Sequence, residues 1–220
     1  MAEDIRNITA TKGLEAFERQ FVRPHCLVLD SGYCSMGRMI GLKACNAAGY
    51  DYYDAVILLE LLPEGSVTAD EVRQFEERLR CRDWSKKELE ADPQYQRINA
   101  AFNRAVDLAL AKGPCLIHDR ITKREVLAKG YSCLSAMTYA HDRQAKLVRA
   151  RTSPLYQSIS DDETVFRMIE EEDMIRKNWH RAHSDSPWGS RDEYDLMLNT
   201  DQLGRDYAAR ILAMLMQETE

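Results

Sequence analysis

Apolar residues follow two patterns along this chain. Continuous apolar runs lie at 26–30, 115–119 and 132–140, and shorter candidate strands lie at 52–53 and 194–198. A short run that is apolar throughout is typical of a strand buried on both faces of a sheet. Between the runs, apolar residues recur three and four positions apart, as they do in helices. Because strands that alternate with helices are joined by βαβ crossovers, the pattern predicts an α/β fold with a mostly parallel sheet covered on both faces.

Capping signals indicate where several helices begin and end. One helix is expected from Gly37 to a C-capping Gly49, and another from about Pro93 to Gly113-Pro114. Asp54 is expected to be the N-cap of the helix that begins AVILLELL. Three S/T-x-x-E capping boxes predict further helix starts, namely Thr68 with Glu71, Ser85 with Glu88, and Ser160 with Glu163.

The two helices nearest the carboxyl end are expected to differ in burial. The segment that begins at Ser160 runs to about His183, and its charged stretch at 170–177 leaves little apolar face, so we expect it to project from the core. His180 and His183 have no nearby third ligand, which is typical of surface histidines rather than of a metal site. The last helix is expected to bury one apolar stripe, which consists of Leu203, Tyr207, Ile211 and Leu215.

Composition indicates an ordinary soluble protein. The chain has 220 residues, of which 45% are apolar and 30% charged, and its formal net charge is −6. The acidic balance argues against a general binder of polyanions, so no nucleic-acid partner is expected. The start MAEDIRNITA is not signal-like, and no window approaches the roughly 20 apolar residues of a membrane span. We therefore expect a cytoplasmic protein with no membrane segment.

The cysteines indicate reduced thiols rather than a metal centre. They are scattered along the chain with no CxxC pair, whereas a zinc site requires clustered ligands. Mostly buried thiols are the expected state in a cytosolic protein. The six residues are Cys26, Cys34, Cys45, Cys81, Cys115 and Cys133.

Polar residues that follow the predicted strands are candidates for one common site. They lie at 30–39, at 119–120 and in the segment after Ala140. Ligands of parallel sheets bind at the carboxyl ends of the strands, so we expect these segments to line one cleft.

The first of these segments fits the pattern G-x-x-x-x-G of a phosphate loop. It consists of Gly32, Tyr33, Cys34, Ser35, Met36, Gly37, Arg38 and Met39. A phosphate loop binds through backbone N–H groups and a helix N-terminus, and Arg38 could supply the charge that a lysine usually brings. Met39 cannot bind magnesium as the usual hydroxyl does. The spacing alone fits either a phosphate loop or an ordinary turn between strand and helix.

Two further features are also open to two interpretations. Asp119 ends an apolar strand, where it either binds Mg²⁺ through water or caps the next helix. Arg143, Lys146 and Arg149 are spaced three apart, and they form either a clamp for transferring phosphates or a solvated helix face. The solvated face is the preferred interpretation for Lys146 and Arg149. Arg143, which lies just beyond a strand, is the best candidate for the clamp.

Several motifs together resemble a known family. They are SMGRMIG, YDYYD, GPCLIHDR, YAHDRQAKLVRAR and EEDMIRKNW followed by WGSRDEYDLMLNT, in that order over residues 26–215. The set resembles the cytidylate-kinase-like proteins, a branch of the phosphate-loop nucleoside monophosphate kinases. The resemblance implies a three-layer P-loop fold, with ATP and Mg²⁺ as cofactors. It also implies a single domain at 26–220, with an acceptor-side insertion at 64–95 and a lid at 160–190, and the spacing of Phe17 and Phe21 predicts a helical leader at 1–25 before it.

The resemblance also implies roles for single residues. Ser35, Gly37 and Arg38 match the phosphate loop. The other matches are Asp54 and Arg120 on the acceptor side, Arg143 near the phosphates, and Asp173, Arg176 and Lys177 in the lid. Arg38, Arg143 and Arg176 are therefore the expected catalytic arginines.

The chain departs from the family pattern at three positions. Cys34 and Met36 replace two loop glycines, although glycine is the residue that best tolerates positive φ. Ile121 follows Arg120 where cytidylate kinases have an aspartate, so the acceptor need not be CMP.

Two hypotheses of function follow. In the first, the protein is a kinase that transfers a phosphoryl group from ATP to a nucleoside monophosphate or a similar small acceptor. In the second, it is a catalytically impaired nucleotide-binding protein on the same scaffold. Either protein could also form a homo-oligomer.

Overall fold

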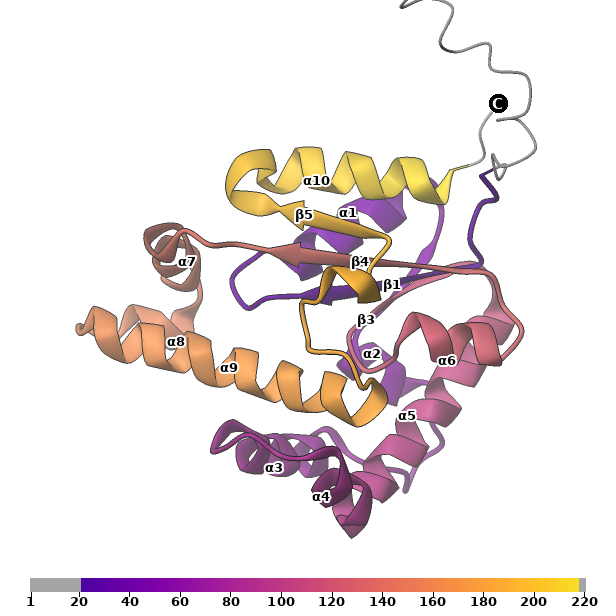
Figure 1. Cartoon of the computed structure of the whole chain (residues 1–220), viewed down its shortest axis with the longest axis horizontal. Helices are drawn as coiled ribbons and strands as arrows, with labels where there is room; N and C mark the ends of the chain where they lie inside the picture. Colours follow the sequence, from indigo (N-terminus) through magenta and orange to yellow (C-terminus); the bar gives the residue numbers. More distant parts are fainter. Residues whose placement is uncertain (1–20, 218–220) are drawn as a thin grey trace, which may run out of the picture.

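A single parallel sheet organises the molecule. The computed structural model describes residues 21–217, so most of the predicted leader lies outside the described residues. Five strands lie in the order β2-β3-β1-β4-β5 (Figure 1). They are β1 (Cys26–Ser31), β2 (Asp51–Tyr53), β3 (Cys115–His118), β4 (Cys133–Tyr139) and β5 (Leu196–Asn199). Each neighbouring pair is parallel, which confirms the predicted α/β fold.

Helices connect consecutive strands, and one more helix follows β5. They are α1 (Gly37–Ala48), α2 (Ala55–Glu60), α3 (Ala69–Arg80), α4 (Lys86–Ala91), α5 (Pro93–Lys112), α6 (Lys123–Ala128), α7 (Arg143–Ala150), α8 (Pro154–Gln157), α9 (Asp162–His183) and α10 (Thr200–Met216). The capping boxes at Thr68 and Ser85 are present, and Asp54 caps α2 by accepting from two backbone N–H groups. The predicted insertion at 64–95 contains α3 and α4, and the predicted lid at 160–190 contains α9. These domain assignments stay predictions.

The strands alternate their side chains between two cores, which gives three layers. Val28 and Ile117 belong to a core shared with α5, whereas Leu27 and Leu116 belong to a core shared with α1 and α10. Figure 1 shows α1 and α10 on one side of the sheet and α5 and α6 on the other. Because consecutive residues of a strand point to opposite faces, continuous apolar runs are what a doubly covered sheet requires.

Helix α9 differs from the prediction in two respects. It begins at Asp162, and its N-cap is Asp161, which accepts from Thr164 N–H, so the capping box expected at Ser160 and Glu163 is wrong. Its second half does not project from the core, because Ile175 and Trp179 are buried in the same core as α5. The many charges of α9 conceal a short apolar face.

The last helix, α10, buries a different stripe from the one predicted. Tyr207 is exposed, whereas Ala208, Leu212 and Met216 are buried. Both stripes are apolar, so periodicity alone could not decide between them. The alanine-bearing stripe packs where α10 lies against α1, since small residues allow two helices to approach closely.

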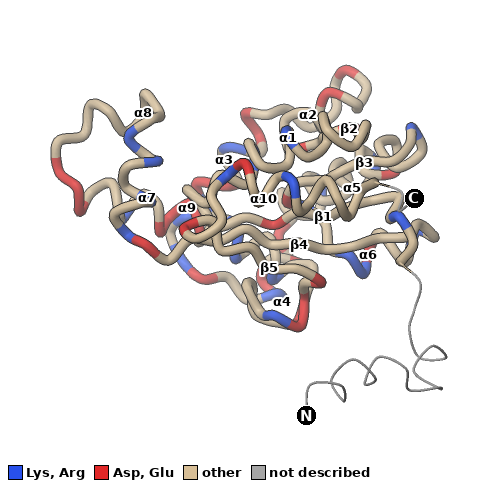
Figure 2. The backbone as a smooth tube through the Cα atoms, turned by 90° about the horizontal axis from the view of Figure 1, so that it is seen from above, with Lys and Arg blue, Asp and Glu red and all other residues tan. Residues whose placement is uncertain are grey.

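Ion pairs join the helices that extend beyond the sheet. Figure 2 shows acidic and basic residues interspersed around α7, α8 and α9. Arg143 pairs with Glu163 at 2.6 Å, and Arg151 pairs with Asp162 at 2.6 Å. Beneath these pairs, a small apolar cluster that includes Leu147, Tyr156 and Ile169 packs against the loop after β1. All six cysteines are free thiols, and four of them are buried.

Candidate functional site

Backbone strain marks two adjacent turns. Within residues 21–217, only four non-glycine residues have positive φ, namely Cys34 (62°), Met36 (64°), Asp119 (63°) and Arg120 (71°). The first two lie after β1 and the others after β3, and these strands are neighbours in the sheet. A left-handed conformation costs a non-glycine residue about 1–2 kcal/mol, and such strain collects at functional sites. Both turns therefore belong to one candidate site.

The turn after β1 presents unpaired backbone N–H groups. Gly32 N–H bonds Thr138 O (2.9 Å) and Ser35 N–H bonds Gly32 O (3.0 Å), which fixes the turn. The N–H groups of Gly37, Arg38 and Met39 open α1, and no described residue accepts a hydrogen bond from them. The first N–H groups of a helix point outward and attract anions. The turn therefore has the features of an anion-binding loop.

Two small residues of the loop are held tightly. A side chain at Gly37 would meet Ser31 Cβ at 2.4 Å, so no larger residue fits there without a shift. Ser35 is fully buried, and its Oγ lies 2.9 Å from Thr138 Oγ1. Cys34 packs against the small cluster near α7, and Met36 packs against the core near α10.

A large pocket lies in front of this loop. Its volume is about 680 Å³, which is within the usual range for a small-molecule site. The loop forms one side, and Asp54 and His118 contribute to the wall. Three arginines from other elements, Arg149, Arg176 and Arg205, also line it. A pocket with free amides and several guanidinium groups suits a polyphosphate.

The basic stripe of α7 has the opposite orientation to the one expected. Arg143 has a 59% exposed side chain that pairs with Glu163 and lies over the Phe166 ring, so the structure does not bring it to the pocket. Arg149 lines the pocket and donates to Cys34 O at 3.2 Å. Lys146 lies 3.5 Å from Asp173. Sequence spacing placed the three on one face but could not show which end of that face meets the loop.

Acidic side chains pair with several of the predicted site residues. Arg38 pairs with Asp54 at 3.2 Å, at the rim of the pocket. Asp173 accepts from Tyr33 N–H at 2.6 Å, so a carboxylate from α9 occupies one amide of the loop. Lys177 pairs instead with Asp83 and does not line the pocket.

His118, which the sequence did not single out, is buried beside the loop. Its ring nitrogens lie 2.7 Å from Ser31 Oγ and 2.9 Å from Tyr52 Oη. Burial lowers the pKa of His118, and the nearby Asp119 only partly opposes this shift. The sequence did contain one signal for His118, because it lies in an apolar strand next to Asp119, which was already a candidate site residue.

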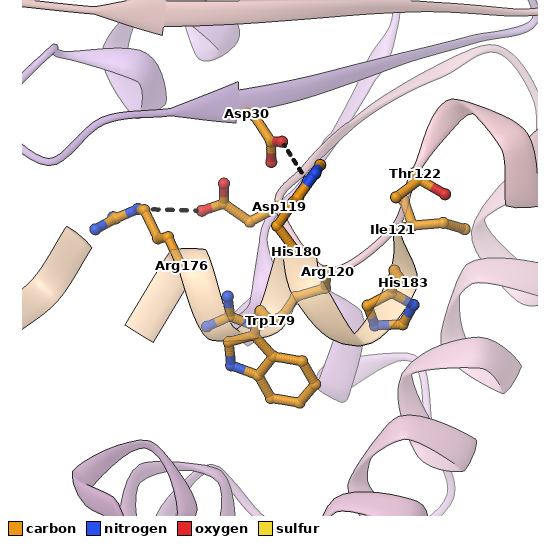
Figure 3. Close-up of a pocket in the computed structure, with 9 residues that line it drawn as sticks. All are labelled: Asp30, Asp119, Arg120, Ile121, Thr122, Arg176, Trp179, His180 and His183. Carbon is orange, nitrogen blue, oxygen red and sulfur yellow. Dashed lines mark ion pairs between the residues drawn. The ribbon is translucent and has the colours of Figure 1, made fainter. Parts of the chain in front are cut away.

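A second, narrow pocket adjoins the first (Figure 3). Asp119 and Arg176 line both pockets, and Arg176 Nε lies 3.7 Å from Asp119 Oδ2. Burial opposes ionisation of Asp119, but His118, Arg176 and Arg120 outweigh it and lower the pKa of the carboxyl group. Asp119 and Arg176 thus form a charged wall between the two pockets.

The second pocket contains Asp30, which belongs to the predicted segment 30–39 but was assigned no role, and two histidines that were not expected there. Asp30, at the end of β1, accepts from Tyr194 Oη at 2.5 Å. His180 and His183 from α9 are buried, so the expectation of surface histidines is wrong. Each has a carboxylate near Nδ1, with Glu125 Oε1 at 2.8 Å from His183. The sequence could not show this burial, because the partners come from other elements.

Arg120 forms the floor of the second pocket. It pairs with Glu76, and its guanidinium lies over the ring of Trp179 at 4.9 Å. Ile121, which replaces the expected aspartate, is buried and also lines the pocket.

The acidic residues allow only a sparse metal site. No group of three or more His, Cys, Asp or Glu side chains within the described residues could hold a metal ion. Magnesium in phosphate sites needs only one or two carboxylates, with waters and phosphates completing its shell. Asp119, which lines both pockets, fits that limited role.

The fold and the loop define the class of protein. A parallel five-stranded sheet with an amide-lined turn between β1 and α1 is the architecture of P-loop kinases. The sequence model of the cytidylate kinase-like family matches residues 28–202, and the chain belongs to this family. Membership in this family supports a nucleotide or small-molecule kinase. No helix between residues 21 and 217 is long and apolar enough to cross a membrane.

The chain resembles solved structures with which it shares little sequence. An uncharacterized protein from Eubacterium ventriosum is 18% identical with a TM-score of 0.62, over 87% of this chain and 97% of that one. A shikimate kinase from Bacteroides thetaiotaomicron is 10% identical with a TM-score of 0.47, over 86% of this chain and 94% of that one. A comparison with curated proteins found no significant relative.

Proposed function

We propose that the protein transfers a phosphoryl group from ATP to a nucleoside monophosphate or a similar small acceptor, with Mg²⁺. The observation that carries the proposal is the pair of adjoining pockets separated by Asp119 and Arg176. The larger pocket faces the loop amides and would hold the donor. The smaller one would hold the reacting end of the acceptor.

Each group of residues has a role in this proposal. The free N–H groups of α1, with Arg38 and Arg149, would bind the donor phosphates. Arg176 would neutralise charge on the transferring group, because it lines both pockets. Asp119 would hold Mg²⁺ through water, and the ion would neutralise phosphate charge. Arg149 takes the place that the sequence had assigned to Arg143.

The acceptor side is held by α2 and the turn after β3. Arg120, which pairs with Glu76, is the residue proposed in the smaller pocket, whereas Asp54, also proposed for the acceptor, pairs with Arg38 and lines the larger pocket. Catalysis would then consist of positioning two substrates and neutralising charge, with α9 excluding water from the smaller pocket.

Turnover can be tested directly. Purified protein is incubated with magnesium-ATP and a panel of nucleoside monophosphates and small hydroxylated compounds, and ADP is measured. Acceptor-dependent ADP is the expected result. Gly37→Val should abolish it, because a side chain at this position meets Ser31. The absence of ADP with every acceptor would count against the proposal.

A second candidate, nucleotide binding without turnover, is favoured by the loop itself. Cys34 and Met36 are strained, Met39 offers no hydroxyl, and the carboxylate of Asp173 occupies the amide of Tyr33. Calorimetric binding of ATP with no turnover would support this candidate. If Cys34→Gly combined with Met36→Gly then produced ADP, the loop would be the cause of the lost activity.

A further inference from the structure

The smaller pocket contains an unusual concentration of unpaired polar atoms. Six buried side-chain nitrogen or oxygen atoms in the described residues have no hydrogen-bond partner. Four of them belong to this pocket, namely Nε of Arg120, Nε of Arg176, Nε2 of His180 and Nε2 of His183. Buried polar groups are nearly always paired, and an unpaired one is costly. Such a concentration indicates a place where a ligand supplies the partners.

One helix face presents most of these atoms. Arg176, Trp179, His180 and His183 lie at positions i, i+3, i+4 and i+7 of α9, and all four line the pocket. Figure 3 shows Arg176 and His180 directed toward Asp119 and Asp30, with Trp179 on the side of α9 away from Asp30. Residues at this spacing share one face of a helix. The charged sequence of α9 is therefore a pocket wall over its second half.

The rest of each side chain is held in place. Glu125 Oε1 lies 2.8 Å from Nδ1 of His183, and Asp30 Oδ2 lies 3.6 Å from Nδ1 of His180. Arg120 is held by Glu76 and by the ring of Trp179. A carboxylate near Nδ1 favours the tautomer or charge state with a proton on that nitrogen. The opposite nitrogen, Nε2, is then left for the pocket.

The two sides of the pocket have different chemistry. The α9 side and Arg120 offer nitrogen atoms, and guanidinium Nε–H groups can only donate. The strand side offers the carboxylates of Asp30 and Asp119, which accept hydrogen bonds. A ligand that satisfies both sides has anionic oxygens at one end and hydroxyl groups at the other.

The available space argues for a small ligand. The pocket has about 20 Å³ of open volume with α9 in this position, which is room for about one water molecule. The region beyond Arg120 is filled by Phe75, Phe102 and Trp179, whose rings pack against one another in the core. A shift of α9 can enlarge the pocket, but a nucleobase on that side would have to displace core side chains.

We propose that the acceptor is a small hydroxylated anion, such as a hydroxy acid or a polyol phosphate, and not a nucleotide. This inference rests on the proposed kinase function. The anionic group accepts hydrogen bonds from Nε–H of Arg120 and Arg176, and hydroxyl groups face Asp30, Asp119 and the Nε2 atoms of the two histidines. One hydroxyl oxygen bonds to the γ-phosphorus of ATP while the bond to the β,γ-bridging oxygen breaks. ADP leaves with that electron pair, and the hydroxyl proton passes to the carboxylate of Asp30.

Tryptophan fluorescence provides a test of anion binding, because Trp179, one of three tryptophans in the chain, lines the pocket. Inorganic phosphate and D-glycerate are titrated into the full chain, and the expected result is a saturable change in tryptophan emission. His183→Gln and His180→Gln should each weaken the binding of D-glycerate by about tenfold, since each removes one acceptor for a ligand hydroxyl group. His141→Gln, at an exposed histidine, is the matched control and should leave it unchanged. Melting curves check that each variant is folded.

A turnover experiment distinguishes the acceptor class from the kinase function itself. ATP binding is measured by calorimetry, and ADP formation is measured with D-glycerate, glycerol 3-phosphate, CMP, UMP and AMP. ADP formation with the hydroxylated anions alone supports the inference. ADP formation with a nucleotide overturns it while the kinase function stands. A lack of any saturable anion signal also overturns it, and a lack of ATP binding defeats the proposed function separately.

Discussion

The thiol-bearing Cys34 holds a backbone conformation that its side chain disfavours. With φ at 62°, its Cβ crowds the following carbonyl, which costs about 1–2 kcal/mol. The same holds for Met36 two residues later, yet both side chains pack against neighbouring clusters. This packing offsets part of the strain and keeps the loop in the shape that its lost glycines would have favoured.

Replacing Cys34 by glycine should therefore stabilise the protein relative to replacing it by alanine. Both changes remove the thiol, but only glycine relieves the left-handed strain. We expect the free energy of unfolding of Cys34→Gly to exceed that of Cys34→Ala by about 1 kcal/mol. Urea denaturation of the two variants measures the difference. Equal midpoints and slopes would show that the conformation carries no strain.

Arg149 and Arg143 provide a matched pair on one helix. Arg149 lines the larger pocket and bonds the loop, whereas Arg143 is exposed and bonds Glu163. Arg149→Gln should weaken ATP binding about tenfold, because a charge-assisted contact is lost. Arg143→Gln should change it less than about twofold. Calorimetry measures the ATP affinity of both variants. A larger loss of affinity in Arg143→Gln than in Arg149→Gln would support Arg143 as the phosphate-binding arginine, as the sequence predicted.

Titration of His118 should appear in the pH dependence of stability. Because burial lowers its pKa, the unfolded chain takes up a proton below about pH 6.5 that the folded chain does not bind. The free energy of unfolding should then fall as the pH decreases, by at most about 1.4 kcal/mol per pH unit for this one proton.

Denaturation between pH 7.5 and 5.5 measures this slope. His118→Asn should flatten it, and His141→Asn, at an exposed histidine, should retain it. A slope that is the same in all three proteins would mean that His118 does not contribute.

At the scale of elements, α9 contributes residues to both pockets. Its Asp173 lies on the loop amide of Tyr33, and one turn later Arg176 lies on the wall between the pockets. Its second half is anchored in the core by the buried side chains of Ile175 and Trp179. The helix therefore links the loop to the interior.

The contact of Asp173 should oppose donor binding. Its carboxylate carries the same sign as a phosphate and occupies an amide that a phosphate would use. Asp173→Asn should tighten ATP binding by about fivefold, since one unfavourable charge is removed at short range. Glu170→Gln, at an exposed position of the same helix, should have no effect. Weaker ATP binding in Asp173→Asn would instead assign the carboxylate a supporting role.

Local signals in the sequence were sufficient for most elements. The continuous apolar runs and the caps at Asp54, Thr68 and Ser85 depend on a few neighbouring residues, so a single sequence shows them. The cap of α9 was misplaced by one residue because Ser160 and Asp161 are both good caps. Burial of Trp179 depends on α3 and α5, which are distant in sequence, and no periodicity shows that contact.

At the scale of the molecule, topology brought together what the sequence kept apart. The turns after β1 and β3 meet because these strands pair in the sheet, as parallel-sheet rules predict. Asp30, His118 and Asp119 lie together for the same reason. The contribution of His180, His183 and Tyr194 could not be predicted, since it depends on how α9 and the segment before β5 fold back over the sheet.

The wall shared by the two pockets ties their ligands together thermodynamically. A donor that draws Arg176 away from Asp119 changes the charge that an acceptor meets in the smaller pocket. An acceptor that moves Arg176 changes the charge in the larger pocket in the same way. Linkage requires both affinities to change by the same factor, whichever ligand binds first. A ligand bound in one pocket should therefore change the affinity measured for a ligand of the other pocket, even in a variant that catalyses no phosphoryl transfer.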